Sequence, residues 1–163
     1  MPEKTHDPEA TVAADWLQNN AHLCQVSTKR LSAEKVRPGR AIKWDFSLKK
    51  SLGFSKDHIH IVMSCKATAE GKSEKSLGVI EAEVVGNYQI GEDHPHIPPS
   101  GAMLFGDEVG IRDVFPYLRQ ALDLMAMQVG LGRVKLDPPK PSNAVDRQDS
   151  SHSRDSAPVE GSS

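Results

Sequence analysis

The stretch FGDEVGIRDVFPYLRQALDLMAMQV, from Phe105 to Val129, decides the fold, because its apolar residues recur every three or four positions. That spacing lines one face of an α-helix with apolar side chains. The face consists of Phe105, Val109, Ile111, Val114, Phe115, Leu118, Leu122, Met125 and Val129. Pro116 lacks the backbone N–H that a helix interior uses, so we expect it to kink or divide the helix. Gly130 and Gly132 are expected to end it.

Upstream of this helix the apolar residues alternate with polar ones, which is the pattern of a β-strand with one buried and one solvated face. The clearest example runs through Ile42, Trp44, Phe46 and Leu48, which alternate with Lys43, Asp45, Ser47 and Lys49. Two further segments, from His58 to Ala67 and from Ile80 to Ile90, alternate in the same way. The polar residues 70–75 between those two segments predict a hairpin.

A fourth, weaker strand is predicted over residues 23–36. Its alternation slips between Val26 and Leu31, where we expect a β-bulge. Four strands followed by a helix predict an α+β fold, with a four-stranded antiparallel sheet that is covered on one face by the helix and solvated on the other.

The two ends of the chain differ from this central part. Residues 1–20 are expected to form an N-terminal tail or a short helix, in which Asp7 is the N-cap and Pro8 occupies the first turn. Residues 21–137 form the predicted domain. Residues 138–163 are rich in proline and serine and carry few bulky apolar side chains, so we expect this tail to be disordered.

Composition narrows the possible functions. Acidic and basic residues are mixed and the formal net charge is −2, which argues against nucleic acid as a partner. No apolar run approaches the roughly 20 residues that span a bilayer, and the first residues do not resemble a signal peptide. We therefore expect a cytoplasmic protein without direct membrane insertion. Cys24 and Cys65 are expected to be free thiols.

The sequence contains no clear catalytic constellation. His58 with His60, and His94 with His96, have a spacing that two metal ligands on a strand would use, but the first pair belongs to a polar strand face and the second to a proline-rich loop. Glu81 and Glu83 share a strand face, which more often indicates a solvated or partner-facing strip than an acid/base pair. The familiar nucleophile, metalloprotease and phosphate-loop motifs are missing. We expect no enzyme, cofactor or metal.

One sheet and one helix leave more large apolar side chains than two layers need. Trp44, Phe54 and Tyr88, together with Met125 and Met127 of the helix, form this surplus. Symmetric self-association is the usual way to bury such a surplus.

Several short pieces resemble the SecB family of export chaperones. They are Val114-Phe115-Pro116-Tyr117-Leu118-Arg119, then Gly130-Leu131, then Val134-Lys135-Leu136-Asp137-Pro138, and, at the end of the fourth predicted strand, Val85-Gly86-Asn87-Tyr88-Gln89-Ile90. A proline inside a helical repeat makes the first piece the most specific. The resemblance covers residues from Leu23 to Pro138.

This resemblance implies an ATP-independent holdase that binds unfolded preproteins or an antitoxin in extended grooves, and a homotetramer built as a dimer of dimers. Candidate peptide-binding residues are Trp44, Phe46, Leu52, Phe54, Tyr88 and Ile90. Candidate residues of the oligomer interface are Tyr117, Arg119, Leu122 and Met125. Ordinary core packing is the alternative for each of them.

The resemblance also implies docking of the SecA translocation ATPase on an acidic sheet face. Here Glu81 matches the docking carboxylate, Val79 stands for a nearby leucine, and Glu83 is a weaker addition. The chain departs from the family because its tail lacks the second helix and the acidic character that help to bind SecA. Protection of an antitoxin within a toxin–antitoxin system is therefore an alternative to export. A different class of function also remains, in which the protein is a non-chaperone adaptor that binds one folded partner through its sheet face.

Overall fold

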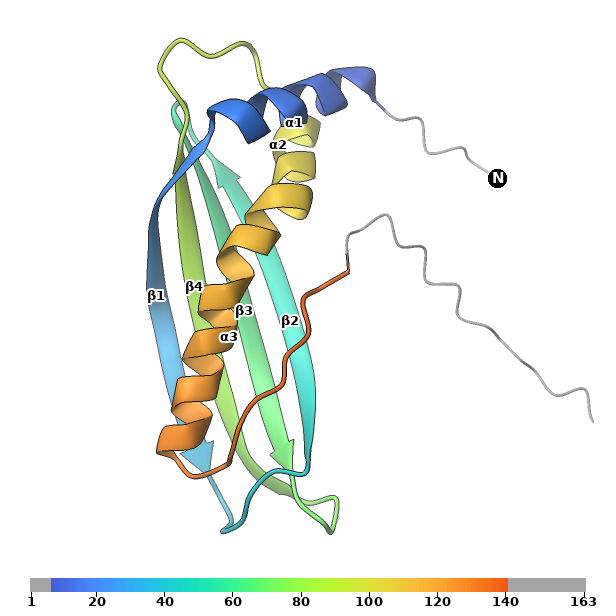
Figure 1. The fold of residues 1–163 in the computed structure, drawn as a ribbon, viewed down its shortest axis with the longest axis vertical. Helices are drawn as coiled ribbons and strands as arrows, with labels where there is room; N and C mark the ends of the chain where they lie inside the picture. The colour runs from blue at the N-terminus through green and yellow to red at the C-terminus, as the bar shows by residue number, and fades with distance from the viewer. Residues whose placement is uncertain (1–6, 141–163) are drawn as a thin grey trace, which may run out of the picture.

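The computed structural model describes residues 7–140 and has the α+β architecture that the sequence predicts (Figure 1). The elements, in chain order, are α1 (Pro8–Asn20), β1 (His22–Lys35), β2 (Lys43–Phe54), β3 (His58–Glu70), β4 (Ser76–Gln89), α2 (Pro99–Phe105), η1 (Gly106–Gly110) and α3 (Ile111–Gln128). In Figure 1 the helical run from α2 to α3 lies lengthwise on one face of the sheet, and α1 crosses one end. No helix within residues 7–140 has the length and hydropathy needed to cross a membrane.

The sheet has the strand order β1-β4-β3-β2, and all its neighbouring strands are antiparallel. The hairpin predicted between β3 and β4 is present, and Glu74 adopts a positive φ of 56° in its turn. The connection from β1 to β2 passes from one edge of the sheet to the other. Both edge strands therefore come from the first half of the chain.

The β-bulge predicted in the first strand is confirmed. The register of β1 against β4 shifts between Thr28 and Arg30, inside the stretch where the alternation slips, and again between Leu23 and Gln25. Each shift inserts an extra residue and reverses the side-chain pattern, which explains why this strand is the weakest in the sequence.

The core lies between the helical run and the sheet. Alternate residues of β3 and β4 point to the helix and are buried: Ile59, Ile61, Met63, Cys65 and Ala67 on β3, and Ile80, Ala82, Val84 and Tyr88 on β4. They pack against Val114, Leu118 and Leu122 of α3, each 0% exposed. The opposite face of these strands carries partly exposed polar residues, as the sequence predicts.

Of the two expectations for Pro116, division of the helix is wrong, while a kink stays a prediction. Pro116 lies inside α3, which continues without interruption from Ile111 to Gln128. The irregularity is at η1 instead, where the Ile111 N–H donates to the Gly106 carbonyl and forms a turn of π-helix. Gly110 fits there because a Cβ on it would lie 1.8 Å from Cδ1 of Ile61, so this turn rests directly on β3.

The short helix expected near the N-terminus is present as α1. The Asp7 side chain accepts a hydrogen bond from the Glu9 N–H at 3.1 Å, and Pro8 occupies the first turn. Ala10, Ala13 and Leu17 are buried, mainly against α2. At the other end, the sequence predicts disorder for residues 138–163. Most of these, residues 141–163, lie outside the described part of the chain, so the prediction is not tested there.

Candidate functional site

The chain reverses direction after α3 and runs back along it. We call residues 131–140 the strap (Figure 1, red-orange). The reversal uses Gly130 and Gly132, whose φ angles are 70° and 94°. Residues that carry a Cβ rarely adopt such angles, whereas glycine does so without strain. The strap has no regular secondary structure, yet Leu131, Val134 and Leu136 are buried in the core.

Four hydrogen bonds fix the strap, the first of which runs from the Leu131 N–H to the Ala126 carbonyl of α3 at 2.9 Å. The Ala41 N–H donates to the Leu131 carbonyl at 2.8 Å. The indole N–H of Trp44, on β2, donates to the Arg133 carbonyl at 3.0 Å. The Val134 N–H donates to Oδ1 of Asp123, on α3, at 2.9 Å. The strap is therefore held between the edge strand β2 and the long helix.

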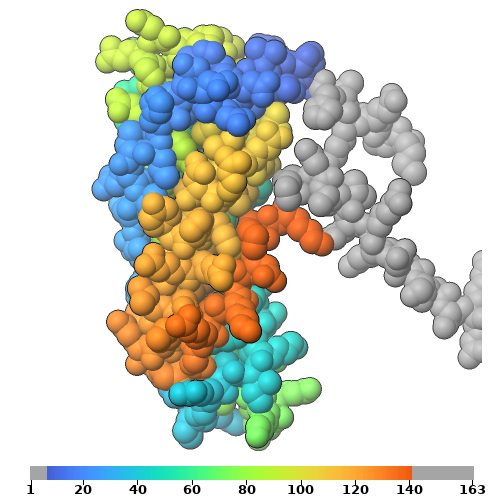
Figure 2. Space-filling model, viewed as in Figure 1, coloured from blue at the N-terminus to red at the C-terminus, as the bar shows by residue number. Residues whose placement is uncertain are grey.

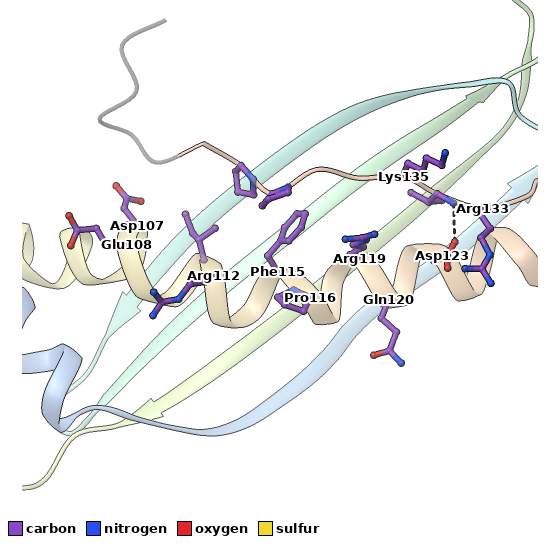
Figure 3. Close-up of a pocket in the computed structure, with 14 residues that line it drawn as sticks. Asp107, Glu108, Arg112, Phe115, Pro116, Arg119, Gln120, Asp123, Arg133 and Lys135 are labelled. Atoms are coloured by element: carbon purple, nitrogen blue, oxygen red, sulfur yellow. Dashed lines mark hydrogen bonds between the residues drawn. The ribbon is translucent and has the colours of Figure 1, made fainter.

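An open groove of about 790 Å³ lies between α3 and the strap. Its lining residues are Asp107, Glu108, Ile111, Arg112, Phe115, Pro116, Arg119, Gln120, Asp123, Arg133, Val134, Lys135, Pro138 and Pro139. In Figure 2 the strap lies beside α3 on the molecular surface, and in Figure 3 Phe115 points from α3 toward the strap. The floor is apolar because Ile111 and Phe115 are 8% and 5% exposed and surrounded by core residues.

Charged residues stand at the two ends of this groove. Asp107 and Glu108 lie at one end, in η1, and Arg119, Arg133 and Lys135 lie toward the other (Figure 3). Asp107 forms an ion pair with Lys50 of β2. Arg112 and Gln120 also line the groove but point to the other side of the helix in Figure 3, where Arg112 pairs with Asp113 at 3.7 Å. The groove thus combines an apolar floor with a rim of opposite charges.

Four of the six predicted peptide-binding residues lie on the helix-facing side of β2. Trp44, Phe46 and Leu52 are partly exposed, and Phe54 is 43% exposed. The rings of Trp44 and Phe46 are parallel, with an interplanar angle of 12° and centroids 6.4 Å apart. Leu52 lines a small pocket of about 110 Å³ that shares Asp107 and Ile111 with the groove. None of the four lines the groove itself: Leu52 adjoins it through the small pocket, and Trp44 reaches the strap through its hydrogen bond to Arg133.

The other two, Tyr88 and Ile90, are core residues, so in this conformation their assignment to a surface groove is wrong. They are 1% and 0% exposed. The Tyr88 hydroxyl donates to Oδ2 of Asp113 at 3.0 Å, and its ring meets Phe105 edge-on. Burial, with the neighbouring Asp113 carboxylate as a second cause, raises the pKa of Tyr88. Its role here is to tie β4 to α3.

The predicted oligomer residues separate into three places. Tyr117 and Met125 line a hollow of about 260 Å³ between α3 and β1, together with Val26, Leu31 and Leu124. Arg119 lies in the groove instead. Leu122 is 0% exposed, so its assignment to an interface is wrong for the chain as it stands.

The predicted docking residues Val79, Glu81 and Glu83 share the outer face of β4, away from the helices. Each is partly exposed, and Glu81 is 4.0 Å from Lys66 of β3. The structure brings the three together, while docking itself stays a prediction.

The histidine pairs lie apart from any group of possible metal ligands. His58 and His60 stack with ring centroids 6.2 Å apart and contact Asp57 and Asn87 through Nδ1. Within residues 7–140 no three histidine, cysteine or acidic side chains are close enough together to hold a metal ion. Cys65 is a buried thiol whose pKa burial raises to about 11, and Cys24 is exposed.

The sequence analysis missed the groove. The helical period correctly assigns Ile111 and Phe115 to the buried face, but it does not show that this face ends at an open rim. The alternation of Arg133 and Lys135 with Val134 and Leu136 was the available signal, since it is typical of an extended segment with one buried and one exposed side.

Comparison with solved structures shows a SecB-like fold. A SecB-like chaperone from Mycobacterium tuberculosis, solved in complex with a ChAD peptide from an antitoxin, superposes with a TM-score of 0.68. The similarity covers 79% of this chain and 97% of that chain, at 14% sequence identity. At this identity the likeness concerns the fold alone.

A protein of unknown function from Streptococcus agalactiae also matches, with a TM-score of 0.41 and 13% identity over 72% of this chain and 96% of that chain, too low to support an argument. No protein-family model matches the sequence. No curated protein matches it either.

Proposed function

We propose that the protein is an ATP-independent holdase that binds unfolded polypeptide segments in the groove between α3 and the strap. The observation that carries this proposal is the groove itself, which is about 790 Å³, open to solvent and floored by Ile111 and Phe115. An open apolar groove suits a segment of a longer chain, whose two ends must leave the site.

Two further features support this proposal. The strap is an extended segment that already packs against α3 and β2 through alternate apolar residues, so the same surfaces are compatible with an extended client beside it. The stacked Trp44 and Phe46 offer a second, sequence-tolerant contact area nearby. Weak contacts at both places add through multivalency when one client reaches both.

The SecB-like fold supports the class of client. Because the mycobacterial chaperone of this fold was solved with an antitoxin peptide, unfolded preproteins or an antitoxin are the clients that we propose here. We also propose a cytoplasmic homotetramer, and contact of the SecA ATPase with the outer sheet face around Glu81 and Glu83. The second candidate function is a non-chaperone adaptor, which the polar outer face favours because it presents Val79, Glu81 and Glu83 together.

The test measures aggregation of a chemically unfolded, slowly refolding client by light scattering, with the same client in its folded state as control. We expect suppression at near-stoichiometric ratios without ATP. A groove variant, Pro138→Asp with Pro139→Asp, places charges on the apolar wall and should weaken suppression several-fold. Val36→Asp with Pro38→Asp is its matched control, since both residues are exposed in the connection between β1 and β2 and the change in net charge is the same.

Absence of suppression by the folded wild-type protein would exclude the holdase. Binding of a single folded partner that survives in the groove variant would favour the adaptor instead. Equal suppression by both variants and the wild type would move client binding away from this groove.

A further inference from the structure

The charges on the groove are unevenly compensated. At the end near η1, Asp107 pairs with Lys50, and Glu108 is the acidic group there that forms no ion pair with another residue of 7–140. Toward the other end, Asp123 is the nearby carboxylate, and its Oδ1 accepts the backbone N–H of Val134. Arg119, Arg133 and Lys135 make no side-chain ion pair or hydrogen bond with any residue in the described range 7–140.

These three cations come from two elements that meet at the groove. Arg119 projects from α3, while Arg133 and Lys135 belong to the strap, and all three are exposed. The strap is held in place through the main chain of Arg133 and Val134, so the charged side chains remain available. Two of them are arginines, whose planar guanidinium can form two parallel hydrogen bonds with one carboxylate.

We infer, as an extension of the proposed function and resting on it, that the groove selects its clients by charge. Its preferred occupant is an extended apolar segment with acidic residues on one flank, whose carboxylates lie against Arg119, Arg133 and Lys135. Glu108, at the opposite end, disfavours a second acidic flank there. A segment with basic residues on the same flank meets three like charges.

The expected size of the effect follows from exposed ion pairs. One such pair changes affinity by a few-fold at most, so two or three together should give about a tenfold preference for the acidic flank. The preference should decrease with added salt, because at about 1 M the Debye length falls to about 3 Å. Contacts with the apolar floor are not screened in this way.

The experiment compares three labelled peptides that share one apolar core and carry glutamates, lysines or glutamines on one flank. Binding to the full chain is measured by fluorescence anisotropy at low and high salt. The expected order of affinity is glutamate, glutamine, lysine, with the differences largely removed at high salt.

A double charge reversal, Arg133→Glu with Lys135→Glu, should reverse this order, so that the lysine peptide binds most tightly and the glutamate peptide least. The matched control is Lys29→Glu with Lys49→Glu, which makes the same change in net charge at exposed positions on the edge strand β1 and on β2, away from the groove. It should keep the wild-type order.

The outcomes separate the two proposals. Equal binding of all three peptides overturns charge selection and leaves the holdase intact. No binding of any peptide overturns the proposed function and this inference together. If the charge reversal changes the oligomeric state, measured by sedimentation, while the peptide order stays the same, the cationic end is an interface between copies and the inference fails.

Discussion

Gly86 shows how one residue sets the distance between the sheet and the long helix. It lies in the middle of the sheet, where β4 is flanked by β1 and β3. A Cβ built on Gly86 would lie 2.4 Å from Cγ2 of Val114, which is fully buried in α3. Val114 is β-branched and has few rotamers to escape into, so the helix itself would have to shift.

The substitution Gly86→Ala should therefore reduce the free energy of unfolding by about 1–3 kcal/mol, as overpacking of a core does. Chemical denaturation followed by circular dichroism measures the change. Gly91→Ala is the control, because a Cβ there has no neighbour within 4 Å, and it should leave stability unchanged or raise it by up to about 1 kcal/mol. A Gly86→Ala protein as stable as the control would show that the helix moves away without cost.

Single residues also show what the alternation of apolar and polar residues cannot predict, namely which residues of the helix-facing side are buried. Alternation correctly put Trp44 and Tyr88 on the helix-facing side of the sheet. It could not tell which of them is covered, because that depends on the path of α3, which lies over β4 and leaves β2 partly open. Tyr88 is thus in the core, while Trp44 reaches the strap.

At the scale of the elements, the position of the strap depends on a few separate hydrogen bonds, since it belongs to no strand ladder or helix. The strap has no regular secondary structure of its own, and beyond the helix end, where the Leu131 N–H donates to the Ala126 carbonyl, the bond from the Val134 N–H to Asp123 fixes its position on α3. A partly buried N–H that loses its acceptor costs free energy comparable to the bond itself.

Asp123→Ala should lower stability by about 1–3 kcal/mol and, more specifically, should increase hydrogen exchange at Val134 while the amides of β3 and β4 keep their protection relative to global unfolding. Asp123→Asn retains an acceptor oxygen and should restore much of the protection. Mass-spectrometric or NMR-detected exchange can check both variants. Uniform loss of protection over the whole chain in Asp123→Ala would mean that the strap is not a separate unit.

The long helix and the strap were only partly predictable. The sequence predicted the helix from its apolar period and its end from Gly130 and Gly132. It could not predict the π-turn at η1, because that turn follows from the contact of Gly110 with Ile61, a residue of a distant strand. It misjudged Pro116, whose missing N–H is tolerated within a helix that packs along its whole length.

For the molecule as a whole, one group of exposed apolar side chains lies beside β1. Leu31, Tyr117 and Leu124 are 41%, 47% and 54% exposed around the hollow between β1 and α3, and the outer edge of β1 has no partner strand within the described residues. An apolar patch next to an open strand edge favours association with a second copy.

We expect the protein to self-associate through this face, and Leu124→Lys to weaken the association by about tenfold or more. Sedimentation velocity over a range of concentrations measures it. Val12→Lys is the control, because Val12 is 69% exposed on α1 and away from β1. A monomeric wild-type protein at high concentration would contradict the expectation.

At this scale the sequence was sufficient for the architecture and insufficient for the site. The four strands and the long helix follow from two periods, and both are explicit in the sequence. The groove forms where the strap meets α3, and that meeting depends on hydrogen bonds of Trp44 and Asp123 that no local pattern encodes.

The strand order has a consequence for how each molecule is made. β1 and β2 are synthesised first, but both find their only partners within the sheet in β4 and β3, which follow them in the chain. β2 can pair with β3 as soon as that hairpin has been made, whereas β1 stays without its partner until β4 follows. Until α3 and the strap have been translated, the helix-facing side of the hairpin, with Trp44, Phe46 and Leu48, has no cover. If the proposed holdase function is correct, such a half-made copy is itself a client, and finished copies in the same cell should shield it from aggregation.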